Sequence, residues 1–531
     1  MYGVPAPATC RNHSPETATG RILAGGARAA VATLAALLLG GGCTRQQAPH
    51  EGLVRLSDDE VKNLDPQKIS DLTSLRVAED QFEGLMRHRG DGKAEPGLAV
   101  AMRCSGDGLS CRFTLRPGLR FSDGVPITAT IFAQGFARLR DPATLAPNAK
   151  LFDGIADITA DDPATVTVTL RRPLPWLADL LAQPALAALP MHRIAAAGDR
   201  WTSDRPLVTS GAYRLTGWRL GDRLTLARNP AWHDRPAPTA TIIWQPAEDK
   251  LAALRRFRGQ EADTVSDIPP ARLAWARAHL RGAVRIAPYA GTYYLAFNTR
   301  KPPFDDVRVR RALSIAIDRN WIATQLMGGG EAGALGLVPP VLGGRDADLF
   351  AGHDRPARIR RLLAAAGYGP AHPLVFDVRF NSGGDHRRIA VALAAMWQPY
   401  AVEARLLNSE AALHFAALRL GDFQLARSGW IADVPAPENF LSVHLSKAGA
   451  VNYSGFADPI YDRLVAQALD TVDPAARTRL LEEAEQRLLR AAPILPIYHY
   501  VSRSLVAPDV RGWQDNPMNI HPSRLLYRMP R

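Results

Sequence analysis

Hydrophobic and polar residues alternate along this chain with two different periods, one typical of strands and the other of helices. Residues 163–170, PATVTVTL, alternate with a period of two, which predicts a strand with one buried face. Residues 111–124, CRFTLRPGLRFSDG, predict a strand, a Pro-Gly turn and a second strand. Because helical segments lie between such strands, the sequence predicts an α/β or α+β fold.

Two helical segments carry the residues that mark helix ends. In residues 473–493 leucines recur at helical spacing, and Asp473 is the expected N-cap. Pro474 suits the first helical position, and Pro493 ends the helix. In residues 358–369, RIRRLLAAAGYG, we expect Gly367 to end a helix in the left-handed conformation that glycine adopts readily.

Length and composition indicate a folded protein with more than one lobe. The 531 residues are too many for one ordinary hydrophobic core, and 47% of them are hydrophobic against 22% charged. The formal net charge is +12, but the arginines are scattered and no run of five or more basic residues occurs. We therefore assign the positive charge to a solvated surface and expect no nucleic-acid partner.

The amino-terminal region predicts export. Arg21 and Arg28 precede the apolar residues 29–39, AAVATLAALLL, a run shorter than the roughly 20 residues of a membrane span. A basic region, a short apolar core and small residues predict a signal peptide over residues 1–42, and hence the periplasm or cell envelope. Cys43 resembles the cysteine of a lipobox, although Gly40 stands where that motif prefers an aliphatic residue. Lipidation at Cys43 and simple cleavage nearby both remain open.

Two further cysteines flank a turn. Cys104 and Cys111 lie on either side of a Gly-Asp-Gly sequence, and two strands joined by that turn would bring the sulfurs within bridging distance. An oxidising compartment would allow a disulfide to form, and two unpaired thiols are the alternative. No further metal-ligating residues cluster here, so we expect no zinc site.

Enzyme motifs are absent or out of context. Gly328, Gly330 and Gly333 satisfy G-x-G-x-x-G, but they follow a helical stretch, residues 310–327, where a phosphate-binding loop would follow a strand. We interpret them as a loop after a helix. The sequence contains no G-x-x-x-x-G-K-[ST], H-E-x-x-H or G-x-S-x-G. These observations predict a protein that is not an enzyme and has no cofactor.

Several segments, read in order, resemble one known family. They are NLDPQKIS (63–70), QFEGL (81–85), SGAYRLTGW (210–218), RNPAWH (228–233), YYLAFNTRKPPFDDVRVRRALSIAIDR (293–319), GWIADVPAPENFL (429–441) and AAPILPIYHY (491–500). From about residue 54 to the carboxyl end, the chain resembles the extracellular solute-binding proteins of family 5, the binding components of ABC importers.

The resemblance implies two α/β lobes joined by hinge strands, with an extra α/β domain inserted in the first lobe. It places lobe I at 44–82, 191–290 and 501–531, the inserted domain at 83–190, and lobe II at 291–500.

The resemblance also implies a ligand site in the G-W-x-A-D segment. In peptide-binding members this aspartate holds the ligand's amino group, and Asp433 is the matching residue. Arg427, six residues earlier, is one of the groups that can meet the ligand's carboxylate. Enclosing a zwitterion removes water from both charges, so each charge needs a partner of opposite sign. The alternative is an internal Arg427–Asp433 ion pair.

The resemblance also implies ligand contacts at several individual positions outside this segment. Asn381, His386, Arg419 and Lys301 match residues near the ligand's carboxyl end, although His386 and Lys301 could also be plain surface residues. Leu72 matches the residue whose backbone pairs with the ligand like an added strand. Trp430 is expected to wall a side-chain pocket or to be a core aromatic.

This chain also departs from its relatives. Gly291 and Ile431 replace the cysteines of a bridge that some relatives have, and Ala411 replaces a tryptophan, so the shape of the pocket is left open.

We expect a monomer that captures short peptides and delivers them to ABC permease subunits in the inner membrane. The same fold could instead hold a murein peptide, an opine, a metal chelate or haem. An exported hydrolase, or a sensor or chaperone without transport, are the alternatives from other classes.

Overall fold

The computed structural model describes residues 52–345, 354–383 and 385–529. The predicted signal peptide and Cys43 lie outside the described residues. Within them, no helix combines the length and apolar character needed to cross a membrane.

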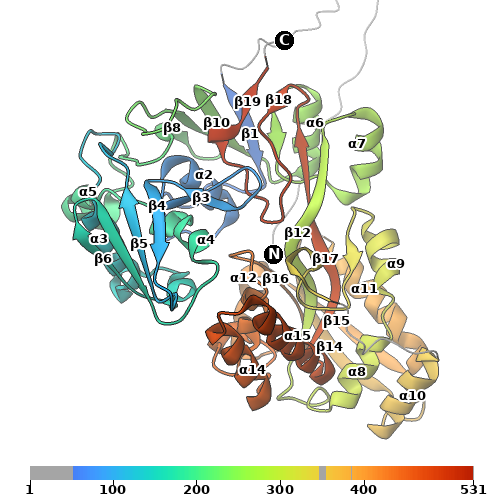
Figure 1. Ribbon diagram of the computed structural model, residues 1–531. Helices are drawn as coiled ribbons and strands as arrows, with labels where there is room; N and C mark the ends of the chain where they lie inside the picture. The colour runs from blue at the N-terminus through green and yellow to red at the C-terminus, as the bar shows by residue number, and fades with distance from the viewer. Residues whose placement is uncertain (1–51, 346–353, 384, 530–531) are drawn as a thin grey trace, which may run out of the picture. The chain divides into compact units, whose positions relative to one another are not determined.

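The largest sheet is built around two long antiparallel strands, β12 (Val284–Phe297) and β17 (Ile494–Val506), which run side by side in Figure 1. The register of their pairing shifts between Pro288 and Thr292 and again between Tyr293 and Tyr294. On one side lie β16 (Leu425–Ile431), β14 (Leu374–Asn381) and β15 (Val402–Ser409). On the other lie β11 (Thr264–Val265), β1 (Leu53–Ser57), β10 (Thr241–Pro246), β9 (Arg223–Arg228) and β8 (Tyr213–Arg219).

A second, antiparallel sheet has the order β4 (Ala99–Cys104), β5 (Ser110–Leu115), β7 (Thr165–Leu170) and β6 (Ile155–Asp162). Helix α3 (Ala129–Arg140) packs on β6 and β7, burying Phe132, Phe136 and Leu139 at helical spacing. Together they enclose a hydrophobic cluster of their own, called the β4–β7 core below.

The remaining hydrophobic residues form separate clusters along the large sheet. One of them, called the α14–α15 core below, gathers residues of α14 (Pro459–Asp470), α15 (Pro474–Ala491) and β12. Others lie under β14 and β16, and around β1, β9 and β10. Several distinct cores agree with the prediction from chain length that one core would not suffice.

The helix predictions are confirmed. α15 begins after Asp473, whose side chain accepts a hydrogen bond from Ala476 N, and ends at Ala491, just before Pro493. α10 (Arg355–Ala365) ends near Gly367, which has a φ of +88°. Gly328 and Gly330 follow α8 (Val307–Ile315), α9 (Arg319–Trp321) and the π-helical turn η6 (Ile322–Met327), so they form a loop after a helix as predicted. Gly333 does not, because it lies in the short strand β13 (Ala332–Gly333), which pairs with β17.

One strand prediction is wrong. β7 and β5 form as expected, but the segment after Pro117 and Gly118 contains only an isolated bridge between Arg120 and Pro126. The chain turns back on itself here, because Phe121 N donates to Val125 O at 2.9 Å and Gly124 N donates to Phe121 O at 2.9 Å. A local turn therefore takes the hydrogen bonds that a second strand would have used.

Candidate ligand-binding site

A cavity of about 270 Å³ brings together segments that lie far apart in the sequence. Its walls come from α2 (Leu72–Gln81), from residues 148–152 and 183–185 beside the β4–β7 core, and from residues 431–433 at the end of β16. Residues 518–520 also line it. Apolar side chains such as Leu72, Leu151 and Phe152 line most of it. Of the predicted site residues, Asp433 and Leu72 face this cavity.

Asp433 lies in the loop between β16 and α13 (Glu438–Leu441). Its Oδ2 accepts a hydrogen bond from Asn439 Nδ2 at 3.4 Å, and no cationic side chain among the described residues forms an ion pair with it. The side chain keeps contact with solvent through the cavity, while burial between the cavity walls raises the pKa of its carboxyl. A carboxylate in this setting can accept a cation from a ligand.

Asn439, which the sequence analysis missed, orders this loop. Its Oδ1 accepts from Trp430 Nε1 at 2.8 Å and from Asp433 N at 3.1 Å. One amide group therefore fixes the indole and the carboxylate together. The available indication in the sequence was an amide side chain six residues after Asp433, at the second position of α13.

Trp430 points away from Arg427. Successive side chains of a strand lie on opposite faces, so Arg427 and Ile431 share one face of β16 and Trp430 lies on the other. Trp430 packs, partly buried, against the α14–α15 core and does not line the cavity. This placement matches the interpretation of Trp430 as a core aromatic.

Leu72 is the first residue of α2, with its side chain 44% exposed. Asp71 caps this helix by accepting a hydrogen bond from Ser74 N. Because the backbone at Leu72 is helical, it is not positioned to pair with a ligand as an added strand would. It can still offer the ligand a backbone N–H, since the first turn of a helix leaves its N–H groups without partners in the helix.

Arg427 lies in the middle of a cluster made by β12, β14, β16 and β17. Its Nη1 is 3.3 Å from Asn381 Oδ1, its Nη2 is 3.4 Å from Tyr500 OH, and its guanidinium carbon is 5.2 Å from the centre of the Tyr293 ring. No carboxylate in the described part of the chain forms an ion pair with it, and its buried Nε has no hydrogen-bond partner. The alternative of an internal Arg427–Asp433 pair is therefore not what the structure contains.

Two histidines complete the Arg427 cluster. His386 opens α11 (His386–Trp397) with its ring 5.6 Å from that of Tyr293, and burial together with the Arg427 charge lowers its pKa to about 3. His414 on α12 (Ala411–Leu420) donates from Nε2 to Arg427 O at 2.9 Å, and burial lowers its pKa also. In both cases the positive charge of Arg427 contributes to the lowered pKa, because it disfavours a second cation nearby. The cluster therefore adds no carboxylate to pair with Arg427.

Lys301 and Arg419 lie elsewhere. Both side chains are exposed, neither hydrogen-bonds to the Arg427 cluster, and neither lines the cavity. Lys301 borders a separate polar pocket with Asp377, Arg379 and Asp422. The structure thus brings Asn381 and His386 to Arg427 but not the two exposed cations.

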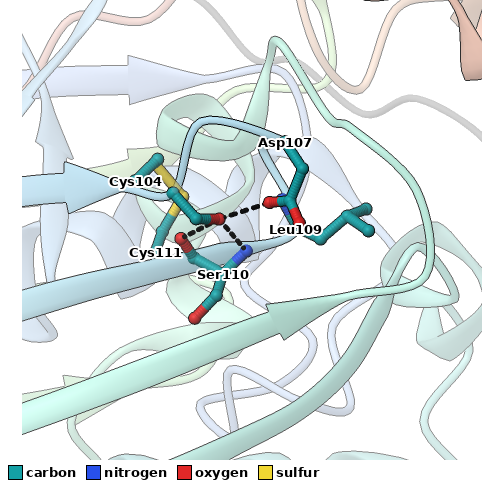
Figure 2. Close-up of a disulfide and its surroundings, with 6 residues drawn as sticks. Cys104, Asp107, Leu109, Ser110 and Cys111 are labelled. Carbon is teal, nitrogen blue, oxygen red and sulfur yellow. Dashed lines mark hydrogen bonds between the residues drawn. A yellow bond between two sulfur atoms is a disulfide. The ribbon is translucent and has the colours of Figure 1, made fainter.

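Cys104 and Cys111 form a disulfide at the end of the β4–β5 hairpin, where the two residues pair across the strands (Figure 2). Asp107 Oδ1 accepts from Leu109 N at 2.9 Å, and Ser105 Oγ accepts from Ser110 N at 3.0 Å, which closes the turn. The bridge fastens an exposed hairpin and does not line the cavity.

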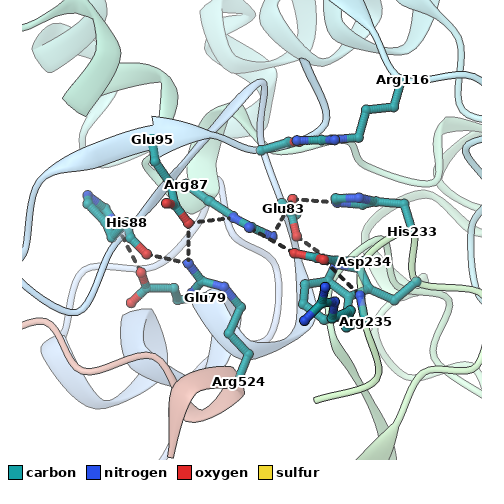
Figure 3. A network of polar contacts seen from close by, with 12 residues as sticks. Glu79, Glu83, Arg87, His88, Glu95, Arg116, His233, Asp234, Arg235 and Arg524 are labelled. Atoms are coloured by element: carbon teal, nitrogen blue, oxygen red, sulfur yellow. Dashed lines mark hydrogen bonds and ion pairs between the residues drawn. The ribbon is translucent and has the colours of Figure 1, made fainter. Parts of the chain in front are cut away.

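A second set of charges, drawn in Figure 3, lies around β2 (Met86–His88), the strand that follows α2. Buried Glu83 accepts from His233 Nε2 at 2.7 Å and Trp232 Nε1 at 2.6 Å. Arg87 pairs with Glu95 at 3.0 Å and Asp234 at 2.9 Å. Burial alone would raise the pKa of Glu83, but His233 and Arg87 hold it below its usual value.

Glu79 and His88 join this network to the cavity. The Nδ1 atom of His88 is 2.9 Å from Glu79 Oε1, and both residues line the cavity wall. The sequence analysis missed both. Within the part of the chain that the structure describes, no group of three His, Cys, Asp or Glu side chains is arranged to hold a metal ion.

Comparison with known proteins places this geometry in a family. Residues 93–452 match the family described as bacterial extracellular solute-binding proteins, family 5 middle. The chain is 33% identical over 493 residues to the periplasmic oligopeptide-binding protein OppA of Salmonella typhimurium, covering 88% of this chain and 90% of that protein. The chain belongs to family 5 of the bacterial extracellular solute-binding proteins.

Solved structures of this family share the fold. The murein tripeptide binding protein MppA of Escherichia coli is 32% identical with a TM-score of 0.81, covering 91% of this chain and 99% of that chain. OppA of Haemophilus influenzae in complex with RPPGFSPFR is 28% identical with a TM-score of 0.81, covering 91% of this chain and 100% of that one. The predicted two-lobe α/β fold is confirmed. The individual domain boundaries stay predictions.

Proposed function

We propose that this protein is the exported binding component of an ABC importer, that it captures short peptides with free ends, and that it passes them to a permease in the inner membrane without any chemical step. The observation that carries the proposal is that Asp433 and Arg427 have no counter-ion in the part of the chain that the structure describes. The relatives described above, named for peptide binding, and the predicted signal peptide support the proposal.

The amino end of a peptide fits Asp433. Removing an ammonium group from water costs several kcal/mol unless an anion replaces the water. Asp433 is such an anion: it faces the cavity, and burial has already raised its pKa. Among the described residues its carboxylate accepts one long side-chain hydrogen bond, from Asn439. An ammonium group bound here would relieve that penalty for both partners.

The carboxyl end fits the Arg427 cluster. A guanidinium can grip a carboxylate through two parallel hydrogen bonds, which are stronger than neutral ones. Arg427 lies over the Tyr293 ring, and its hydrogen bonds to Asn381 and Tyr500, of 3.3 and 3.4 Å, are long. A ligand carboxylate could replace these long contacts with shorter, charge-assisted hydrogen bonds to the guanidinium.

The spacing suits a short ligand. Ile431 lies four positions after Arg427 on β16, about 13 Å along an extended strand, and Asp433 follows two positions later. Asp433 lines the cavity, and Arg427 lies on the same face of β16 as Ile431, which also lines it. An extended tripeptide, about 10 Å long, is comparable with this span. The mostly apolar cavity beside Asp433 would receive a side chain near the ligand's amino end.

Native mass spectrometry of the protein, purified from its own cell envelope without denaturation, tests this function. We expect a ladder of peptide-sized bound masses in the wild type, lost in Asp433→Asn and retained in a matched control, Asp470→Asn, at the exposed end of α14. A single non-peptide mass, or wild-type protein that stays empty with added peptides, would contradict the proposal.

A further inference from the structure

The loop that carries Asp433 is packed into two hydrophobic cores at once. Ala432, Phe440 and Leu441 belong to the α14–α15 core. Val434 and Ala436, which lie between them in the sequence, belong instead to the β4–β7 core, where they are 2% and 4% exposed. The chain therefore leaves the core of one lobe, enters the core of the inserted domain and returns within a few residues.

Polar contacts hold the same loop from both sides. From the large sheet, Ala432 N donates to Ala290 O of β12 at 2.8 Å, and Asn439 binds Asp433 as described above. From the side of the β4–β7 core, Gln183 Nε2 donates to Asp433 O at 3.0 Å. Gln183 follows α4 (Leu177–Leu181), and it lines the same cavity as Asp433.

Trp176, just before α4, strengthens this junction, because its ring packs against both the β4–β7 core and the α14–α15 core. Apolar side chains buried in a foreign core stabilise an interface only while the two bodies are together. The residues flanking Asp433 therefore have a second task besides shaping the site.

We propose that residues 432–437 are a latch that fastens lobe II to the inserted domain, with Gln183 as the positioning residue that holds Asp433 from the inserted domain. The functional consequence rests on the proposed role of Asp433. A ligand amine bound to Asp433 then orders the latch, so that capture of the amino end and fastening of the inserted domain become one event. Lobe II alone would supply an incomplete amino-end site.

Hydrogen–deuterium exchange of the ligand-free protein tests the latch without any ligand. Val434→Asp places a charge in the β4–β7 core, and Gln183→Glu removes the donor to Asp433 O. We expect both variants to speed exchange in residues 177–186 and in residues 430–441. Val472→Asp and Gln325→Glu, the same substitutions at exposed sites, should leave both segments unchanged. Should Val434→Asp fail to fold, Val434→Thr, which keeps the shape of the side chain, takes its place.

Calorimetry with a free tripeptide, trialanine, measures the consequence. We expect the latch variants to weaken binding about tenfold, or 1.4 kcal/mol, and the controls to bind as the wild type does. Unchanged exchange of residues 177–186 in both latch variants would overturn the proposal. If wild-type protein binds no peptide, the proposed function fails, and the exchange result still decides whether the latch exists.

Discussion

The charged side chains around β2 (Met86–His88) have partners of opposite charge, which distinguishes them from the charged side chains on β16 and in the loop after it. In the first region, Glu83, Arg87 and His233 are buried together, and each meets a group of opposite or complementary character. In the second, Arg427 and Asp433 are separated and lack a counter-ion among the described residues. Paired buried charges hold a fold together, whereas an unpaired charge is unfavourable until a ligand pairs with it. Substitutions should therefore affect stability in the first region and ligand binding in the second.

The largest expected effect is on stability, in the paired region. Glu83→Ala removes the acceptor of the His233 and Trp232 hydrogen bonds and leaves Arg87 with one carboxylate fewer, so we expect the free energy of unfolding to fall by about 3–5 kcal/mol. Urea denaturation measures this change. Glu483→Ala at an exposed position of α15 is the control and should stay within about 0.5 kcal/mol of the wild type. Equal stabilities of the two variants would contradict the comparison.

The next effect is on binding, in the unpaired region. Arg427→Met removes the proposed carboxylate receptor, and losing one partner of a charge pair should weaken trialanine binding about a hundredfold, measured by calorimetry. The ligand-free protein should lose less than about 1 kcal/mol of stability, because the substitution also removes a buried charge that has no counter-ion. Arg419→Met, at an exposed residue, is the control. A large loss of stability with little loss of affinity would show that Arg427 is structural.

A smaller effect is expected at Asn439. Asn439→Ala frees the Asp433 carboxylate and the Trp430 indole to turn, and we expect trialanine affinity to fall about tenfold. The loss should appear for peptides with a free amine and not for N-acetylated ones, because Asn439 acts through Asp433. Calorimetry with both peptides separates this role from a general loss of structure, which would weaken both.

The smallest effect is that of pH. Burial raises the pKa of Asp433, and only the ionised carboxylate attracts an ammonium group. Affinity should therefore fall as the pH drops through this raised pKa, by at most about tenfold per pH unit. The ligand-free protein should respond in the opposite sense: since the folded state binds this proton more tightly, the contribution of Asp433 to stability decreases as pH rises from its ordinary pKa to the raised one. Titrations of wild type and Asp433→Asn between about pH 4 and 7 should differ, and identical affinity profiles would contradict the assignment.

Local signals in the sequence predicted the helix ends and the family, but not the assembly of the site. Asp473, Pro474 and Gly367 act within one turn of chain, so their effect is independent of the rest of the fold. By contrast, the pattern of the segment after Pro117 predicts a strand, but its backbone hydrogen bonds close a turn, so no second strand forms.

The candidate site divides in the same way. Asp433 and Arg427 were identifiable because their motif is continuous in the sequence. Tyr500 and His414 were not, because they reach Arg427 only through the register of β17 and the packing of α12. Lys301 and Arg419 are exposed because of how their segments pack against the rest of the fold, which cannot be predicted from a short stretch of sequence.

The central claim is that Asp433 receives the amino end of a peptide, and chemical blocking of that end tests it most directly. Calorimetry would compare free trialanine with N-acetyl-trialanine on wild type and on Asp433→Asn. We expect acetylation to weaken wild-type binding about a hundredfold and to change little in Asp433→Asn, because both changes remove the same interaction. Wild-type protein that binds the acetylated peptide as tightly as the free one would contradict the account.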